Sequence, residues 1–203
     1  NSTVVSALAV LANLLFCSLA AYPLARMRFA GRGLVLALVV ATILIPFQVV
    51  MIPLYLLMVQ LGLRNTLWAL IIPQAATAFG IFLLRQSFAG VPVELEEAAR
   101  IDGASPLQLF VLVYLPLMMP SLVAVGTYAL LLAWNEYLYA FLLLSRDENL
   151  TLAVALGNFL QADDSPWELL MATGLIYALP PAAIYYAFKK YMVSGLTAGA
   201  VKS

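Results

Sequence analysis

Long apolar segments constrain this chain more than any other feature of its sequence. Five runs of roughly 20 residues or more are long enough to cross about 30 Å of hydrocarbon as helices. They cover residues 4–25, 34–59, 66–88, 116–144 and 166–188. Because 65% of the 203 residues are hydrophobic, a water-soluble core is a poor explanation for these runs. The sequence therefore predicts an all-α, polytopic transmembrane helical bundle.

The basic residues predict how this bundle is oriented, because Lys and Arg gather in short cytoplasmic loops. Eight of them fall on the side of the C-terminus: Arg26, Arg28, Arg32, Arg85, Arg100, Lys189, Lys190 and Lys202. Arg64 and Arg146 fall on the opposite side. The pattern predicts a plasma-membrane protein with a cytoplasmic tail over 189–203 and an extracytoplasmic loop over 145–165. Asn1 then lies outside, and we expect at least one helix to precede it.

Several classes of function are disfavoured by what the chain contains. Acidic and basic residues balance at ten each, so net charge predicts no nucleic-acid partner. There is no histidine, and Cys17 is the single cysteine, so the usual metal-ligand sets and the reactive set of an intramembrane enzyme are missing. Without a GxxxxGK[ST] phosphate loop, we expect no cofactor and no ATP use by this chain itself. A passive channel stays open on composition alone.

One short segment, EEAARIDGAS at 96–105, concentrates charge in a chain that is only 10% charged. Pro92 suits the first position of a helix, and three glutamates crowd its positive end. Gly103 predicts the end of this helix, and Ser105 with Pro106 predicts the start of a second one. We expect a compact helix on the cytoplasmic face, although a solvated charged loop is the simpler alternative.

The spacing in this segment is similar to a known motif. Glu97, Ala98 and Ala99 are followed by three residues, Gly103, nine residues and then Val-Tyr-Leu-Pro ending at Pro116. This resembles the EAA motif of ABC importer permeases, with valine in place of isoleucine. The resemblance extends along the chain through AAYPLARMRFAGR, IPLYLLMVQLGLRNT, FLLRQSF, WNEY and GLTAGAVK, and it is closest in kind to the second permease subunit of maltose-type importers.

The resemblance implies a single permease domain over 1–203, with residues 92–115 as a cytoplasmic loop that contains a coupling helix. Family members normally have six spans, so the first would be missing here. The implied partners are a second permease, two cytoplasmic ATP-binding subunits that use ATP and Mg, an extracytoplasmic sugar-binding protein and membrane lipid. The implied contacts with the ATPase are made by Glu97, Ala98, Ala99, Arg100, Asp102, Gly103 and Pro116. Carbohydrate as the solute rests on the same resemblance, and a non-sugar solute of the same importer class is the alternative.

Polar residues inside the apolar runs mark a candidate pathway, because they usually face a bundle interior. We expect this of Asn13, Gln48, Gln74, Thr77, Asn135 and Glu136. The tetrapeptide Trp134, Asn135, Glu136 and Tyr137 combines aromatic faces with an amide and a carboxylate, which is the chemistry that binds sugars. An equally good interpretation is that these residues mark the outer interface and join helices.

The C-terminal tail contains Thr197, Gly199 and Lys202. A frayed terminus is the default expectation for such a peptide. The resemblance implies instead that the tail reaches between the ATPase subunits.

Overall fold

A computed structural model describes residues 1–160 and 167–197, with residues 190–197 described through their backbone alone. Every regular element in these residues is helical, which confirms the predicted all-α fold. The elements are α1 (Ser2–Arg26), α2 (Arg32–Ile43), α3 (Phe47–Gln60), α4 (Trp68–Gln74), α5 (Ala78–Gly90), α6 (Val93–Ile101), α7 (Pro106–Gln108), η1 (Leu109–Tyr114), α8 (Leu115–Leu117), α9 (Met119–Trp134), α10 (Leu138–Leu143), η2 (Asp147–Asn149), α11 (Leu152–Leu160) and α12 (Trp167–Thr197).

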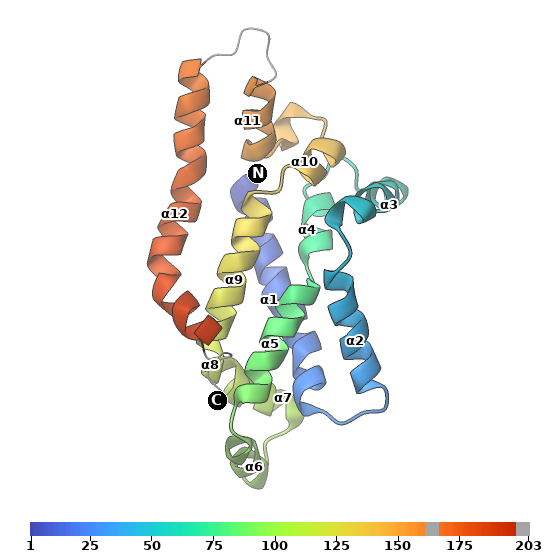
Figure 1. The fold of residues 1–203 in the computed structure, drawn as a ribbon, viewed down its shortest axis with the longest axis vertical. Coiled ribbons are helices and arrows are strands. Elements are labelled where there is room, and N and C mark those ends of the chain that lie inside the picture. The colour runs from blue at the N-terminus through green and yellow to red at the C-terminus, as the bar shows by residue number, and fades with distance from the viewer. Residues whose placement is uncertain (161–166, 198–203) are drawn as a thin grey trace.

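Helix α1 runs through the middle of an elongated bundle and packs along α5 and α9, while α12 packs on the outer side of α9 (Figure 1). Helix α6 lies at one end of the molecule, and α10 and α11 lie at the other. Two buried apolar clusters correspond to these ends. One joins α1, α4, α10 and α11 around Leu70 and Leu143, and the other joins α1, α5 and η1 around Phe88 and Tyr114.

Two of the predicted spans are single helices. They are α1 and the part of α12 over Trp167–Lys189, and both are long and apolar enough to cross a membrane. The other three predicted spans are bent pairs, so the total reaches five when each pair is taken as one span. The bends measure 100° between α2 and α3, 41° between α4 and α5, and 78° where the helical segment Pro106–Leu117 meets α9.

The predicted span over 34–59 is divided into two helices, α2 and α3, which meet at 100°. Helix α2 has 12 residues, which span only about 18 Å. Pro46 disfavours a helical conformation for the residue before it, and it starts α3 in a new direction. Gln48, which we expected to face the interior, is exposed near the start of α3.

The predicted span over 116–144 also differs from the structure. Helix α9 ends at Trp134, and a break over Asn135–Tyr137 separates it from the short α10. Glu136 thus lies in a break between helices and not within a span.

The predicted loop over 145–165 contains a helix, α11, of which Ala153 and Val154 are buried. Leu152 at the start of α11 donates its backbone N–H to the hydroxyl of Ser2, 2.7 Å away, which joins this region to the beginning of α1. Asp163 and Asp164 of the same predicted loop lie outside the described residues.

Candidate functional site

The residues that start and end helix α6 are those that the sequence indicated. Pro92 is its N-cap residue, one position before the place we expected, and Glu94 and Glu96 lie in the first turn. At the other end Gly103 has φ +83°, a conformation that favours glycine. Its N–H bonds to the carbonyl of Arg100 while the N–H of Ala104 bonds to that of Ala99, both at 3.0 Å. This is a Schellman motif, so the predicted stop is confirmed.

The second helix of the loop starts at a capping box. The hydroxyl of Ser105 accepts from the N–H of Gln108 at 3.3 Å, and the Gln108 side chain accepts from the N–H of Ser105 at 2.8 Å. The helix then widens into a π-helical turn, η1, which ends at Tyr114. Such turns are frequent at functional sites, and here the hydroxyl of Tyr114 donates to Glu96 in α6.

Glu96 is the residue on which the loop converges. Its side chain is buried, and its Oε1 accepts from Nε and Nη2 of Arg100 at 3.1 and 2.8 Å. Its Oε2 accepts from the hydroxyl of Tyr114 and lies 3.9 Å from Nη1 of Arg26. A buried carboxylate is tolerated only with such partners, and here both oxygens have them.

Arg26 joins this carboxylate to the helices of the bundle. It is the last residue of α1, and its Nε donates to the carbonyl of Phe88 in α5 at 2.9 Å. Its Nη2 donates to the carbonyl of Val91, just beyond the end of α5. A cation at a helix C-terminus is favourable because it satisfies carbonyls that have no partner within the helix. One guanidinium therefore links α1, α5 and α6.

An aromatic cluster supports these charges from the bundle side. The rings of Tyr22, Phe88, Phe110 and Tyr114 pack with centroids 5.2–6.0 Å apart. The guanidinium carbon of Arg26 lies 5.2 Å from the centroid of the Tyr114 ring, which is a cation–π contact. The carboxylate of Glu96 is joined to this cluster through the hydroxyl of Tyr114.

Two opposing effects set the pKa of Glu96. Burial alone would raise it, but the hydrogen bonds from Tyr114 and Arg100 and the positive charges of Arg100 and Arg26 together lower the pKa below its ordinary value. Glu96 is therefore ionised at neutral pH.

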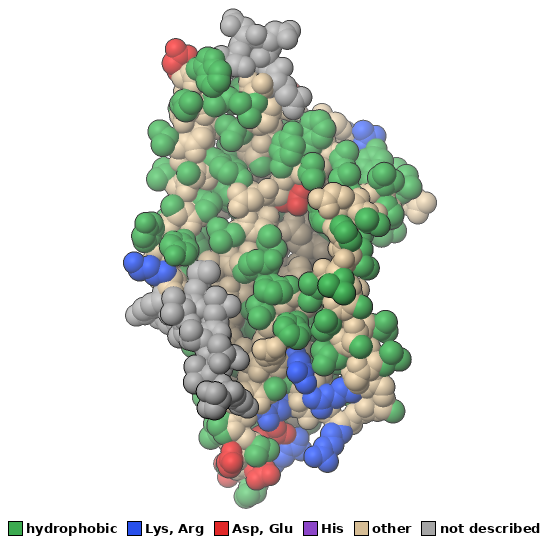
Figure 2. All heavy atoms as spheres, in the orientation of Figure 1, with side chains coloured by type: hydrophobic (Ala, Val, Ile, Leu, Met, Phe, Trp, Pro, Cys, Tyr) green, Lys and Arg blue, Asp and Glu red, His purple; other side chains and the backbone are tan. Residues whose placement is uncertain are grey.

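The remaining predicted residues of the loop lie on its outer surface. Glu97, Ala98, Arg100, Asp102, Gly103 and Pro116 are exposed, and Ala99 is half-buried. Exposed apolar side chains accompany them, since Ile101 is 87% exposed and Leu107 is 68% exposed. Figure 2 shows acidic side chains gathered at this end, with basic ones beside them. The outer face therefore presents a carboxylate next to apolar groups.

Sequence reasoning missed the network of Glu96, Arg26 and Tyr114. The spacing of Glu96 and Arg100, four positions apart on a helix, was the one local indication of an ion pair. Arg26 precedes Glu96 by 70 residues and Tyr114 follows it by 18, so only the tertiary fold brings them together.

The tetrapeptide from Trp134 to Tyr137 has internal partners. Nε1 of Trp134 donates to the carbonyl of Tyr177 in α12 at 3.1 Å, and the hydroxyl of Tyr177 donates to Oδ1 of Asn135 at 2.7 Å. Oε1 of Glu136 accepts from the N–H of Tyr139 at 2.8 Å, which caps the start of α10. The ring of Tyr137 packs against Phe141.

A second polar group lies inside the bundle, at the bend between α4 and α5. Nδ2 of Asn13 donates to the carbonyl of Gln74 at 2.9 Å and to the hydroxyl of Thr77 at 3.2 Å. Cys17 is buried beside them, and its thiol lies 3.5 Å from Oδ1 of Asn13. The expectation that Asn13 and Thr77 face the interior is thus confirmed, whereas the half-buried side chain of Gln74 donates to the carbonyl of Leu70 in its own helix.

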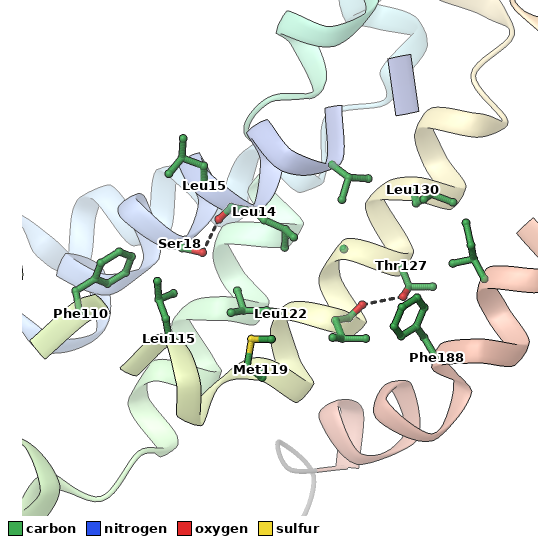
Figure 3. A pocket seen from close by; sticks show the side chains of 14 residues that line it. Leu14, Leu15, Ser18, Phe110, Leu115, Met119, Leu122, Thr127, Leu130 and Phe188 are labelled. Carbon is green, nitrogen blue, oxygen red and sulfur yellow. Dashed lines mark hydrogen bonds between the residues drawn. The ribbon is translucent and has the colours of Figure 1, made fainter. Parts of the chain in front are cut away.

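A cavity of about 430 Å³ lies between α1, α9, α12 and the η1 segment (Figure 3). Its wall consists of apolar groups, among them Leu14, Phe110 and Leu122. Two hydroxyls reach it, those of Ser18 and Thr127, and both donate to carbonyls of their own helices. The cavity therefore lacks the convergent polar groups that a sugar requires.

Of the predicted tail contacts, Thr197 is the last residue of α12, so the helix continues into the region expected to be a flexible peptide. Gly199 and Lys202 lie outside the described residues.

Comparison with known proteins gives concordant matches. The family described as binding-protein-dependent transport system inner membrane component matches residues 13–197. The chain is 36% identical over its full length, and over 72% of the relative, to the arabinooligosaccharides transport system permease protein of Halalkalibacterium halodurans. It is 32% identical to the lactose transport system permease protein of Rhizobium radiobacter, covering all of this chain and 74% of that one. A crystal structure of a bacterial ABC transporter involved in the import of the acidic polysaccharide alginate aligns with a TM-score of 0.83 and 29% identity, over 94% of this chain and 72% of that chain.

Proposed function

Because the chain belongs to the family of binding-protein-dependent transport system inner membrane components, we propose that it is a permease subunit of an ATP-driven sugar importer. Relatives named for arabino-oligosaccharide and lactose transport support carbohydrate as the solute class. The chain forms half of a translocation pathway, and a second permease forms the other half. An extracytoplasmic binding protein delivers the sugar, and two cytoplasmic ATP-binding subunits supply the energy by hydrolysing ATP with Mg.

The observation that carries the coupling assignment is the division of α6 into two faces. Its inner face is fixed to the bundle through Glu96, while its outer face leaves Glu97 and Ile101 exposed. A short helix that is bonded to the bundle on one face and exposed on the other can transmit a displacement of a neighbouring subunit to the bundle. This proposal places α6, the tail and the basic end of the bundle in the cytoplasm.

A charge reversal at Glu97 tests the coupling site. In the proposed complex Glu97 meets a basic group of the ATPase, so Glu97→Lys should lower co-purification of the ATP-binding subunit with this permease at least tenfold. Glu148→Lys is the control and should leave co-purification unchanged, because Glu148 is an exposed glutamate of η2 and lies outside α6. Equal co-purification for Glu97→Lys and the unmodified chain, with equal sugar uptake, would contradict the assignment.

The solute class is tested by uptake into proteoliposomes that contain the assembled complex. We expect ATP-dependent accumulation of at least one of arabinotriose, lactose and maltose in the presence of the cognate binding protein. Uptake of none of these, together with uptake of a non-sugar osmolyte such as glycine betaine, would move the chain to the alternative solute class. Accumulation without ATP would indicate a passive channel.

The C-terminal tail is proposed to contact the ATPase through Thr197, Gly199 and Lys202. Deleting residues 196–203 should alter the ATPase rate of the complex while leaving its assembly intact. A normal ATPase rate in the truncated complex would return the tail to the status of a free terminus.

A further inference from the structure

The EAA glutamate at position 97 is preceded by a second glutamate that points the other way. Glu97 is exposed, whereas Glu96 is 9% exposed and bonded to three side chains. Adjacent residues on a helix differ by about 100°, so one helix can direct one carboxylate outward and its neighbour inward. The two acidic groups therefore have different chemical tasks.

We propose that Glu96 and Arg26 are positioning residues for energy coupling, which together join α6 to the bundle so that α6, the ends of α1 and α5, and η1 move as one block. This inference rests on the proposed function of α6. It differs from a contact with the ATPase, because Glu96 lies on the inner side of the helix and is covered by this chain's own groups.

The geometry of the guanidinium supports a joint between several elements. Arg26 has donors directed to the carbonyls of Phe88 and Val91, and a third nitrogen 3.9 Å from Glu96. Its position is fixed by α5 independently of α6. Glu96 thus attaches to an anchor that is already in place, and the attachment transfers a displacement of α6 to α1 and α5.

Tyr114 completes the joint from the far side of the loop. Its hydroxyl donates to the same carboxylate, and its buried ring packs on Tyr22 and Phe88. The segment that leads from α6 through η1 into α9 is therefore bonded to the carboxylate of Glu96, which also contacts Arg26 at the end of α1. Removal of the Glu96 charge would release α6 from the ends of α1 and α5 and from η1, because Arg26 and Tyr114 join these elements to the carboxylate.

The first test measures the coupling ratio, defined as sugar imported per ATP hydrolysed, in proteoliposomes of the assembled complex. The probe is whichever of lactose, maltose and arabinotriose the unmodified complex imports. Glu96→Gln keeps the shape of the side chain and removes its charge, so we expect the ratio to fall about tenfold, which corresponds to about 1.4 kcal/mol. Co-purification of the ATP-binding subunit should stay at the unmodified level, since Glu97 is intact.

Two further variants separate coupling from folding. Tyr114→Phe removes one hydrogen bond and should lower the ratio less than Glu96→Gln, and Arg26→Gln should lower it to the same extent as Glu96→Gln. Glu94→Gln is the matched control and should have no effect, because Glu94 is exposed on the same helix. An unchanged ratio in Glu96→Gln, or loss of assembly in all three network variants, would overturn the inference in favour of a purely structural role.

A second measurement needs no transported sugar. Spin labels at Leu95→Cys and Arg28→Cys, in a Cys17→Ser background, report the distance between α6 and the segment that follows α1; Leu95 is exposed and lies on another side of α6 from Glu97. In the unmodified network the distribution of distances between the two labels should be narrow, and its mean should stay constant when ATP is added to the complex. Glu96→Gln should broaden this distribution. A distance that changes with ATP in the unmodified network would overturn the inference. Failure of the ATP-binding subunit to co-purify would instead count against the proposed function, while the labels would still report the joint in the chain alone.

Discussion

Trp134 in α9 donates its indole N–H to the backbone carbonyl of Tyr177 in α12, across 3.1 Å. In a regular helix that carbonyl would accept from the N–H of residue 181, but Pro181 has no N–H. The proline thus leaves an acceptor without a partner in its own helix, and a side chain from the neighbouring helix satisfies it. Helix bundles in membranes tolerate internal prolines by this kind of compensation.

This relationship predicts the behaviour of a double-mutant cycle. Trp134→Phe should lower the free energy of unfolding by about 1–3 kcal/mol, since it leaves a partly buried carbonyl unpaired. Pro181→Ala restores a donor within α12, so the same Trp134 substitution should cost less in that background. Thermal unfolding in detergent measures both, with the exposed Trp68 replaced by Phe as the control. An equal loss in both backgrounds would show that the indole acts only through its volume.

The stability of the loop should depend on pH through Glu96. Because the pKa of Glu96 is lowered below its ordinary value of 4.5, its contribution is complete above that value and is lost as the pH falls through the folded-state pKa. The melting temperature of the unmodified chain should therefore exceed that of Glu96→Gln at pH 7, and the difference should shrink as the pH falls below 4.5. A difference that is the same at pH 7 and below pH 4.5 would contradict an ionic role. Glu94→Gln controls for the general effect of removing an acidic group.

Gly80 should not tolerate a side chain. A methyl group at this position would lie 2.8 Å from Oγ1 of Thr77, 3.0 Å from Sγ of Cys17 and 3.2 Å from Oδ1 of Asn13. Gly80→Ala should then separate α5 from α1 and destabilise the protein by about 1–3 kcal/mol. Gly90→Ala, at the end of the same helix with open space around it, should be neutral by comparison. Equal melting temperatures for the two variants would show that the α1–α5 contact yields easily.

Gly103 and Gly31 offer a matched pair, because both have φ +83° and both face open space. Alanine should cost about 1–2 kcal/mol of local stability at either position. Only Gly103→Ala changes the end of α6, so it alone should reduce co-purification of the ATP-binding subunit. If Gly31→Ala reduces it equally, the effect is one of general stability and not of α6.

The bonds of Asn135 and Glu136 within the chain favour their interpretation as residues that join helices. An Asn135→Ala, Glu136→Gln double variant should accordingly melt at a lower temperature and still import sugar with an unchanged apparent affinity. Uptake assays over a range of sugar concentrations measure this. A several-fold weaker apparent affinity at unchanged stability would favour the alternative, a place in the sugar pathway.

Local chemistry accounts for what the sequence could predict. Apolar runs predicted α1 and α12, and Gly103 and Ser105 marked the ends of the helices in the loop because caps depend on neighbouring residues. The size of the bend between α2 and α3, 100°, could not be predicted, because hydropathy measures the length of an apolar run and not its direction. Pro46 was the available indication of a break.

The interior of the candidate site depends on tertiary contacts. Three glutamates in four residues look equivalent in a sequence, and only packing against Arg26 and Tyr114 distinguishes Glu96 from Glu97. For the same reason, nothing near Trp134 in the sequence identifies Tyr177 as its partner.

Helix α1 is held at both of its ends, by the bond between Ser2 and Leu152 at one and by Arg26 at the other. Its 25 residues make a rod about 37 Å long. The elements bonded to its two ends are thereby tied to one rod, so a displacement at the start of α11 is transmitted along α1 to the carboxylate of Glu96 in α6.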